Sequence, residues 1–393
     1  MKILMIAPEP FFEPRGTPFS EYFRIKALSA LGHTIDLVTY PFGVDKHISG
    51  LKILRCAKLP WITSVRTGPS LAKVGLDFFL LLKVLQRLWR EDYDLIHTHE
   101  EASLIGVFCQ KMTKIPHLYD MHSSLVQQMD NFHFTRSKII IRLFKFSETI
   151  SLKNASAVIV ICRSLFDYAA GITAAAKLTL IENFMDDRPR ISSEEKILQV
   201  KGEINADGKK VIMYAGTLEA YQGIPLLLES MHYLSDDFRL VLIGGKEEQV
   251  ARLRRQVQEM KLETRVMALG QKRSGDIPYY LHAAAVLASP RILGTNIPLK
   301  IYSYLASGVP VVATDLPTHT QSVSRDIAFL AAPEPEAFAA AIRLAAGPQG
   351  EAVAGRALAY CREHFTVERY TELVAQALAK AVPSVAAPTP IPQ

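Results

Sequence analysis

Short, continuous apolar runs alternate with longer amphipathic stretches along most of the chain. The first run covers residues 2–7, and similar runs recur at 34–40, 94–98 and 117–121. Runs of this length are typical of strands that are buried on both faces of a parallel sheet. The amphipathic stretches between them, such as 19–31, predict helices. This alternation predicts an α/β protein built from βαβ units.

The alternation stops once and then restarts. Residues 185–208 are polar and charged and lack a strand pattern, so we interpret them as an interdomain linker. We predict an N-terminal domain at 1–184 and a C-terminal domain at 209–366, each a Rossmann-like, doubly wound sheet. A helix at 367–382 that packs back on the N-terminal domain and a disordered, proline-rich tail at 383–393 complete the chain.

The most informative stretch is 289–313, which reads as strand, polar glycine loop, helix, turn and buried strand. Pro298 suits the first turn of the helix, and Gly308 suits its end. A helix N-terminus presents free N–H groups and the positive end of a dipole, so the loop at 294–296 is a candidate anion site. The alternative is an ordinary loop of an α/β domain.

Ligands of doubly wound sheets bind beyond the carboxyl ends of the strands. Two such edges that face each other would form a deep interdomain cleft. The rule places His99 and His122 on this edge of the N-terminal domain, and Gly216 and Gly244 on that of the C-terminal domain. We assign His97 to the other side of its strand, with a structural role.

Composition adds a charge asymmetry. The 393 residues carry a net charge of +6. By count, residues 1–183 hold 22 Lys and Arg against 16 Asp and Glu, whereas the remainder holds 23 of each. The excess therefore lies in the N-terminal half, which favours an anionic partner there. The alternative is a modest charge that serves solubility.

Several classes of protein are disfavoured by the sequence. Its four cysteines are scattered without a CxxC pair, as in reduced cytosolic proteins. Residues 1–7 predict a first strand and not a signal peptide, and no apolar run reaches 18 residues. A dinucleotide fingerprint, a Walker loop, zinc-ligand spacing and a Ser-His-Asp arrangement are absent.

The ordered motifs resemble those of GT-B fold glycosyltransferases, and specifically glycosyltransferase family 4. The match runs along nearly the whole chain through Met5–Pro8 with Gly16, residues 94–99, Tyr119–His122, residues 214–223, Leu269-Gly270 and residues 298–313. The resemblance implies transfer of a sugar from a nucleotide-sugar, with retention and without a metal or other cofactor. It implies a donor site in the C-terminal half and an acceptor site in the N-terminal half.

The chain departs from the family pattern at its charged donor residues. Thr217 and Gln222 stand where an Arg and a Lys are usual, and Thr295 and Ser303 stand where two Glu are usual. Positive charge for a leaving diphosphate must then come from elsewhere. Lys300 and Arg291 are the nearest candidates, with backbone N–H groups at Asn296 to Leu299.

The resemblance therefore gives a set of expected site residues. We expect catalytic roles for His122, Thr295 and Lys300. The expected acceptor contacts are His99 and Glu100, with a helix start as the alternative role of Glu100. Donor contacts are expected at Gly16, Gly216, Thr217, Gln222, Gly244, Gln271, Arg291, Asn296, Ile297, Pro298, Leu299 and Ser303.

Two basic segments also carry aromatic and aliphatic residues. They are Lys52–Arg90, with Trp61 and Trp89, and Arg136–Lys145. Such a mixture suits an anionic bilayer surface, although two ordinary core helices would explain it too. Nucleic acid is disfavoured because base-stacking motifs are missing.

The sequence thus predicts a cytoplasmic glycosyltransferase, peripheral on the inner face of the cell membrane. It would use a UDP- or GDP-sugar and a glycan or lipid-linked acceptor in envelope polysaccharide or glycolipid synthesis. One alternative is a GT-B nucleotide-sugar epimerase, which generally needs more acid–base carboxylates. The other is a catalytically weakened GT-B protein that serves as a binding or partner subunit.

Overall fold

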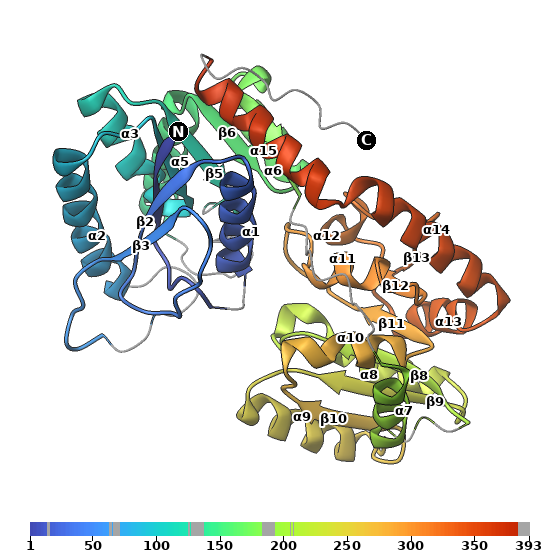
Figure 1. Ribbon diagram of the computed structural model, residues 1–393. Coiled ribbons are helices and arrows are strands. Elements are labelled where there is room, and N and C mark those ends of the chain that lie inside the picture. The colour runs from blue at the N-terminus through green and yellow to red at the C-terminus, as the bar shows by residue number, and fades with distance from the viewer. Residues whose placement is uncertain are drawn as a thin grey trace. The chain divides into compact units, whose positions relative to one another are not determined.

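A computed structural model gives the fold of the chain (Figure 1). It describes residues 1–13, 16–62, 65, 71–124, 126, 137–182, 193–204, 206 and 208–383. The chain divides into two compact units. Unit 1 contains Met1–Phe184 and Val367–Gln393, and unit 2 contains Met185–Thr366.

Unit 1 is built on a parallel sheet of seven strands in the order β3-β2-β1-β4-β5-β6-β7. The strands are β1 (Lys2–Ala7), β2 (Thr34–Thr39), β3 (Leu51–Arg55), β4 (Leu95–His99), β5 (His117–Met121), β6 (Ala157–Val160) and β7 (Leu178–Leu180). The helices are α1 (Gly16–Ala30), α2 (Leu71–Arg90), α3 (Ser103–Thr113), α5 (Lys138–Asn154), α6 (Arg163–Ala170) and α15 (Val367–Ala381), and a 3₁₀ turn, η1, covers Glu100–Ala102.

Unit 2 contains a parallel sheet of six strands in the order β10-β9-β8-β11-β12-β13. Its strands are β8 (Lys210–Ala215), β9 (Phe238–Ile243), β10 (Val266–Gly270), β11 (Val286–Ser289), β12 (Val311–Thr314) and β13 (Phe329–Ala331). Its helices are α7 (Glu194–Glu203), α8 (Ile224–Ser230), α9 (Glu247–Glu259), α10 (Ile277–His282), α11 (Lys300–Leu305), α12 (Pro317–Thr320), α13 (Pro335–Ala345) and α14 (Pro348–His364), with 3₁₀ turns that include η3 (Ala220–Gln222).

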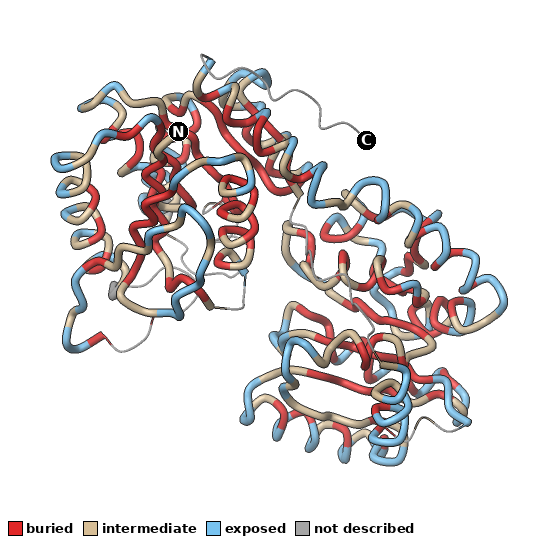
Figure 2. The backbone as a smooth tube through the Cα atoms, viewed as in Figure 1, coloured by how far each residue is buried: buried red, intermediate tan, exposed pale blue. Residues whose placement is uncertain are grey.

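The continuous apolar runs explain the position of the strands. β1, β4, β5 and β6 are buried over almost every residue, because helices cover both faces of the sheet. Figure 2 shows the same burial along the strands of both units. The predicted fold class, an α/β protein with two Rossmann-like parallel sheets, is confirmed.

The structure differs from the sequence-based expectations at three places. Residues 194–203 of the expected linker form helix α7, which packs on α10 within unit 2. Helix α1 begins at Gly16, which has φ of 48°, three residues before the expected start at residue 19. Helix α11 begins only at Lys300, after Pro298, and has six residues. The expected tail lies outside the described residues, except Pro383.

Helix α15 packs against α1 and against β5, β6 and β7, so it is an integral part of unit 1. Its inner side buries Tyr370, Val374 and Leu378. Lys380 Nζ also donates to the backbone oxygen of Leu178 at 2.6 Å. Among the described helices of both units, none is long and apolar enough to cross a membrane.

Candidate functional site

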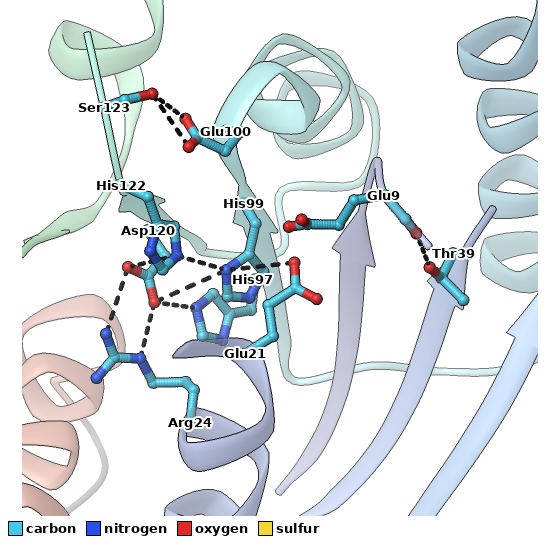
Figure 3. Close-up of polar contacts among 10 residues, drawn as sticks. All are labelled: Glu9, Glu21, Arg24, Thr39, His97, His99, Glu100, Asp120, His122 and Ser123. Carbon is cyan, nitrogen blue, oxygen red and sulfur yellow. Dashed lines mark hydrogen bonds and ion pairs between the residues drawn. The ribbon is translucent and has the colours of Figure 1, made fainter. Parts of the chain in front are cut away.

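The carboxyl edge of the unit 1 sheet gathers a dense group of ionisable side chains (Figure 3). Strand β4 carries His97 and ends with His99. Strand β5 carries Asp120 just before its last residue, Met121, and His122 follows the strand directly. Glu21 and Arg24 reach the same place from α1. Two neighbouring parallel strands and the helix packed over them therefore build this group.

A buried ion pair lies at its centre. Arg24 Nε is 2.7 Å from Asp120 Oδ2, and neither side chain is exposed. Burial alone would raise the pKa of Asp120, but Arg24 and the neighbouring histidines together hold that pKa well below its usual range. The guanidinium of Arg24 also lies 5.2 Å from the ring centroid of Tyr370 on α15.

Three histidine rings are stacked beside this ion pair. The His97 and His99 centroids are 4.7 Å apart, and those of His99 and His122 are 5.3 Å apart. His99 Nδ1 and His122 Nε2 form a hydrogen bond of 3.0 Å. Burial lowers the pKa of His122 to about 4, and it lowers the pKa of His97 and His99 as well. The three rings are therefore neutral at neutral pH and can exchange hydrogen bonds without carrying charge.

Our expectation for His97 was wrong. Residues two apart in a strand point to the same face of the sheet, so His97 and His99 lie together. His97 Nε2 is 3.6 Å from Asp120 Oδ2, and its ring stacks on that of His99.

Carboxyl groups complete this edge. Burial raises the pKa of Glu21 to about 7, and it raises those of Glu9 and Glu100 well above their usual range. Ser123 Oγ lies 3.0 and 2.9 Å from the two Glu100 oxygens. Glu100 has φ of 47°, a left-handed conformation that is uncommon for a residue other than glycine.

The group also raises the question of a metal ion. One ligand atom each of His97, His99 and Asp120 lies within 4.8 Å of the others. However, Asp120 Oδ2 already accepts a hydrogen bond from Arg24 Nε at 2.7 Å. A divalent cation bound there would lie beside the guanidinium charge, which would repel it. These residues fit an internal ion pair better than a metal site.

In unit 2, three of the expected donor residues come together around Lys300. Lys300 Nζ donates to Gln222 Oε1 at 2.8 Å, and Gln222 Nε2 donates to Thr217 Oγ1 at 3.3 Å. A Cβ on Gly216 would lie 2.9 Å from Lys300 Nζ, so a larger residue there would displace the ammonium. Tyr214, which the sequence analysis did not single out, places its ring centroid 3.8 Å below the same ammonium.

Lys300 and Arg291 form a pair of like charges. Burial lowers the pKa of Lys300 well below its usual value, and the charge of Arg291 lowers it further. Burial also lowers the pKa of Arg291, whose guanidinium lies over the Tyr221 ring at 5.1 Å. No carboxylate of the described residues offsets either charge. An anion bound beside these two side chains would favour the protonated form of Lys300 and offset the charge of both.

The loop between Arg291 and α11 is held by side chains that the sequence analysis missed. Gln321 Nε2 donates to the backbone oxygen of Thr295 at 2.6 Å, and Thr318 Oγ1 donates to that of Asn296 at 2.9 Å. Both donors lie on or directly after α12. Their order in the sequence gives no signal of these contacts, because the two segments meet only in the folded unit.

Some of the other expected donor residues are packed inside unit 2, and others are partly or fully exposed to solvent. A Cβ on Gly244 would lie 2.0 Å from the Gly216 oxygen, so Gly244 is required for packing under the Gly216 turn. Ile297 and Pro298 are buried. Gln271 is exposed after β10, an edge strand, and Ser303 is half-buried on α11.

The helix start expected at Pro298 needs correction, whereas the anion site at residues 294–296 stays a prediction. Because α11 starts at Lys300 and spans six residues, the N–H groups of Asn296 to Leu299 lie before the helix. Ile301 N–H already bonds to the Pro298 oxygen at 2.9 Å. The side-chain cations, rather than a helix dipole, are the stronger feature of this site.

Several solved structures have the same fold as this chain, and each aligns with nearly all of it. HepE from Anabaena, in complex with UDP, shares 19% identity, covers 96% of this chain and 100% of its own, and gives a TM-score of 0.77. Sucrose-phosphate synthase from Thermosynechococcus elongatus shares 21% identity over 98% of this chain and 100% of its own, also with a TM-score of 0.77. WaaG, a glycosyltransferase involved in lipopolysaccharide biosynthesis, shares 12% identity over 96% and 99%, with a TM-score of 0.71. The fold is that of the GT-B glycosyltransferases.

Family models sharpen this assignment. The model for Glycosyltransferase Family 4 matches residues 24–188, and the model for Glycosyl transferases group 1 matches residues 209–346. The chain belongs to the family 4 glycosyltransferases of GT-B fold, and it is therefore a glycosyltransferase. This assignment confirms the resemblance seen in the sequence. No curated protein sequence matches it.

Proposed function

We propose that this glycosyltransferase moves a sugar, with retention, from a UDP- or GDP-sugar to a glycan or lipid-linked acceptor in envelope polysaccharide or glycolipid synthesis. The observation that carries the proposal is the pair of uncompensated cations, Lys300 and Arg291, beside Gly216 and Gln222 in unit 2. HepE, which shares the fold, has been solved with UDP, with UDP-glucose and with UDP and glucose.

In this proposal unit 2 binds the donor. Negative charge develops on the leaving diphosphate as the glycosidic bond breaks, and Lys300 and Arg291 would stabilise it in place of the two cations usual in the family. The Gln222 amide orients the ammonium of Lys300. Thr295 would contact the sugar, with Asn296 to Leu299 and Ser303 lining the rest of the donor site and Gln271 beside the base.

Unit 1 would bind the acceptor and the sugar side of the donor. A neutral His122 can donate to a sugar hydroxyl without placing a charge near the reacting carbon. Glu100 and His99 would contact acceptor hydroxyls, and Gly16 would lie close to the donor. Our proposal requires no metal ion, since the positive charge at the diphosphate comes from side chains.

We place the enzyme in the cytoplasm, on the inner face of the cell membrane. The basic segments Lys52–Arg90 and Arg136–Lys145 support this location, although Arg136 lies outside the described residues. WaaG, which has the same fold, is involved in lipopolysaccharide biosynthesis.

The first experiment is to find which nucleotide diphosphate the protein binds. A nucleotide at 100 times its Kd stabilises the folded state by about 2.7 kcal/mol, which raises the melting temperature measurably. We expect UDP or GDP to do so, and the matching nucleotide-sugar to release nucleotide slowly in water. A melting temperature unchanged by both nucleotides would contradict the proposal, and a changed sugar with the nucleotide retained would favour epimerase activity.

The Lys300→Ala variant tests the site itself. Because hydrogen bonds to charged groups contribute about 1.5–3 kcal/mol, nucleotide affinity should fall roughly tenfold or more in calorimetry. Lys209→Ala, at an exposed position of unit 2, is the matched control and should bind normally. Unchanged affinity in Lys300→Ala would refute the role of Lys300.

A further inference from the structure

Helices α2, α3 and α5 lie on one face of the unit 1 sheet. The connections β3–β4, β4–β5 and β5–β6 all run in one direction across the sheet, and right-handed crossovers then place their helices on the same side. α3 packs against α5, and α2 and α3 share a core that includes Leu80 and Cys109. Helix α1 connects strands in the opposite direction and packs with α15, so these two cover the other face.

The outer sides of these three helices expose a set of large apolar residues. Their exposed fractions range from 41% to 85%, and on each helix they recur at a spacing that keeps them on one side. Figure 2 shows α2 alternating between buried and exposed turns. The residues are Val74, Phe78, Leu82 and Trp89 on α2; Leu104, Phe108 and Met112 on α3; and Ile139, Ile140, Leu143 and Phe146 on α5.

Acidic and basic side chains on these helices point in different directions. Asp77 and Glu148 are the sole carboxylates within the described spans of α2, α3 and α5. Both point inward, where Asp77 accepts from Tyr40 and Glu148 accepts from Ser124 and Tyr168. Besides Lys153, which lies near the end of α5, four exposed cations remain among the apolar residues: Arg90, Lys111, Arg142 and Lys145.

Some basic residues of the segments Lys52–Arg90 and Arg136–Lys145 are held in ion pairs within unit 1 and are not available for contacts with a partner. Lys73 forms an ion pair with Glu101 at 2.7 Å, and Arg87 forms one with Asp36 at 2.8 Å. α3, which lies outside the two segments noted in the sequence, adds three apolar residues and Lys111. The surface defined by the structure is therefore different from the basic segments alone. We call these eleven apolar residues and four cations the three-helix face.

We propose that the three-helix face docks on the surface of an anionic lipid bilayer, with its apolar side chains in the headgroup region and its cations on lipid phosphates. This extends the proposed function by naming the surface on which the enzyme works, but it does not require transferase activity. Aromatic and aliphatic residues interleaved with Lys and Arg have the composition of an interfacial membrane contact.

Charge complementarity favours a bilayer over a second copy of the chain. A symmetric dimer places the same patch against itself, so Arg142 and Lys145 would meet the cations of the partner without an acidic residue between them. An anionic bilayer offers phosphates at every position of the face, and each Lys or Arg near such a surface adds to binding.

The experiment is co-sedimentation of the full-length protein with vesicles of phosphatidylcholine alone or of phosphatidylcholine mixed with phosphatidylglycerol. No nucleotide-sugar is added, so the outcome is independent of the transferase reaction. We expect binding to the anionic vesicles at low salt and a much weaker interaction at high salt. Failure to bind anionic vesicles at low salt would overturn the proposal.

Two sets of variants separate apolar from charged contributions. Phe78→Gln, Phe108→Gln and Phe146→Gln together remove one exposed aromatic from each helix, and the matched control is Leu198→Gln, Tyr233→Gln and Leu344→Gln in unit 2. Lys111→Glu, Arg142→Glu and Lys145→Glu reverse three charges, matched by Arg252→Glu, Arg255→Glu and Arg362→Glu. Each variant of the three-helix face should lower the partition coefficient about tenfold or more, and each control should bind normally.

Two outcomes would contradict the assignment. If controls and variants lose binding equally, the interaction depends on general charge or hydrophobicity and not on this face. If the wild type is a dimer by sedimentation velocity and the apolar variant is a monomer, the occupant is a second copy. Nucleotide binding of each variant, measured separately, reports on unit 2 and leaves the two proposals distinguishable.

Discussion

At the scale of single residues, the two units differ in whether a buried basic side chain is paired with a carboxylate. In unit 1 the buried charge of Arg24 is matched by Asp120, with three neutral histidines around the pair. In unit 2 Lys300 and Arg291 act on each other without a described carboxylate nearby. In the first arrangement the two opposite charges compensate each other, whereas in the second an anionic ligand would supply the compensating charge.

The Arg24–Asp120 pair gives a prediction about stability. Arg24→Met leaves a buried carboxylate without its partner and should lower the free energy of unfolding by about 3–5 kcal/mol in urea denaturation. The control is Arg163→Met, which breaks an exposed pair with Asp167 and should cost less than about 1 kcal/mol. If both variants lose the same small amount, the buried pair is not important for stability.

Glu21 gives a prediction about pH. Its pKa is about 7 in the folded protein against 4.5 ordinarily, so the folded state holds a proton that the unfolded state releases. Its contribution to stability is therefore present below pH 4.5 and is lost as the pH rises towards 7, by up to about 3 kcal/mol.

The measurement is the unfolding free energy of the wild type minus that of Glu21→Gln across this pH range. The difference should fall as the pH rises, whereas Glu363→Gln, at an exposed position, should show no such slope. A flat difference for Glu21→Gln would contradict the burial of its carboxyl group.

The sequence indicated His99, Glu100 and His122 as site residues, and the structure places all three at the same sheet edge. It did not indicate Glu21, Arg24 or Asp120. Arg24 lies 96 positions from Asp120, and their contact depends on how α1 packs over β5. A strand pattern predicts which face a residue points to, but not which helix residue meets it there.

At the scale of elements, α12 and the residue after it hold the loop that carries Thr295. The donors Thr318 and Gln321 reach two successive backbone oxygens, so the loop is fixed from one side. If Thr295 contacts the donor sugar, these bonds set its position without touching the substrate.

Gln321→Ala should therefore lower kcat about tenfold while changing UDP or GDP affinity less than about twofold, because the phosphate-binding cations are untouched. Steady-state kinetics and calorimetry measure the two quantities. Thr320→Val, which removes an exposed hydroxyl of the same helix, is the control. Equal losses of kcat and nucleotide affinity would indicate general damage to unit 2.

Strands were easier to predict than short helices. β1, β8 and β12 coincide with continuous apolar runs, since burial on both faces demands such runs. Helix α7 was missed because its sequence is mostly polar and only Val200 is buried. α11 was expected to begin earlier, because Pro298 is compatible with a helix start but does not require one.

At the scale of the whole molecule, unit 1 is made from two separate parts of the chain. α15 contributes Tyr370, which packs on the buried Arg24, and so connects the end of the chain to the polar group at the centre of unit 1. The sequence predicted a helix here that packs back on the N-terminal domain, but its particular contacts with β5, β6 and β7 follow only from the three-dimensional structure.

Removal of residues 367–393 should therefore destabilise unit 1 while leaving unit 2 folded. We expect the truncated protein to lose its unit 1 melting transition or to show it at a markedly lower temperature, with nucleotide binding by unit 2 retained. A truncation after Pro383 keeps all the described contacts of α15 and is the control. Two unchanged melting transitions in the shorter protein would contradict the role of α15.

The position of α15 has a consequence for synthesis on the ribosome. Residues 1–184 are made first, but they receive their last helix only after the whole of unit 2, residues 185–366, has been translated. At roughly 5–20 residues per second, this delay lasts on the order of 10–40 s. Unit 2 is continuous in sequence and can fold in that interval. The later half of the chain is therefore expected to reach its native state first, while the nascent unit 1 keeps the surface meant for α15 exposed to chaperones.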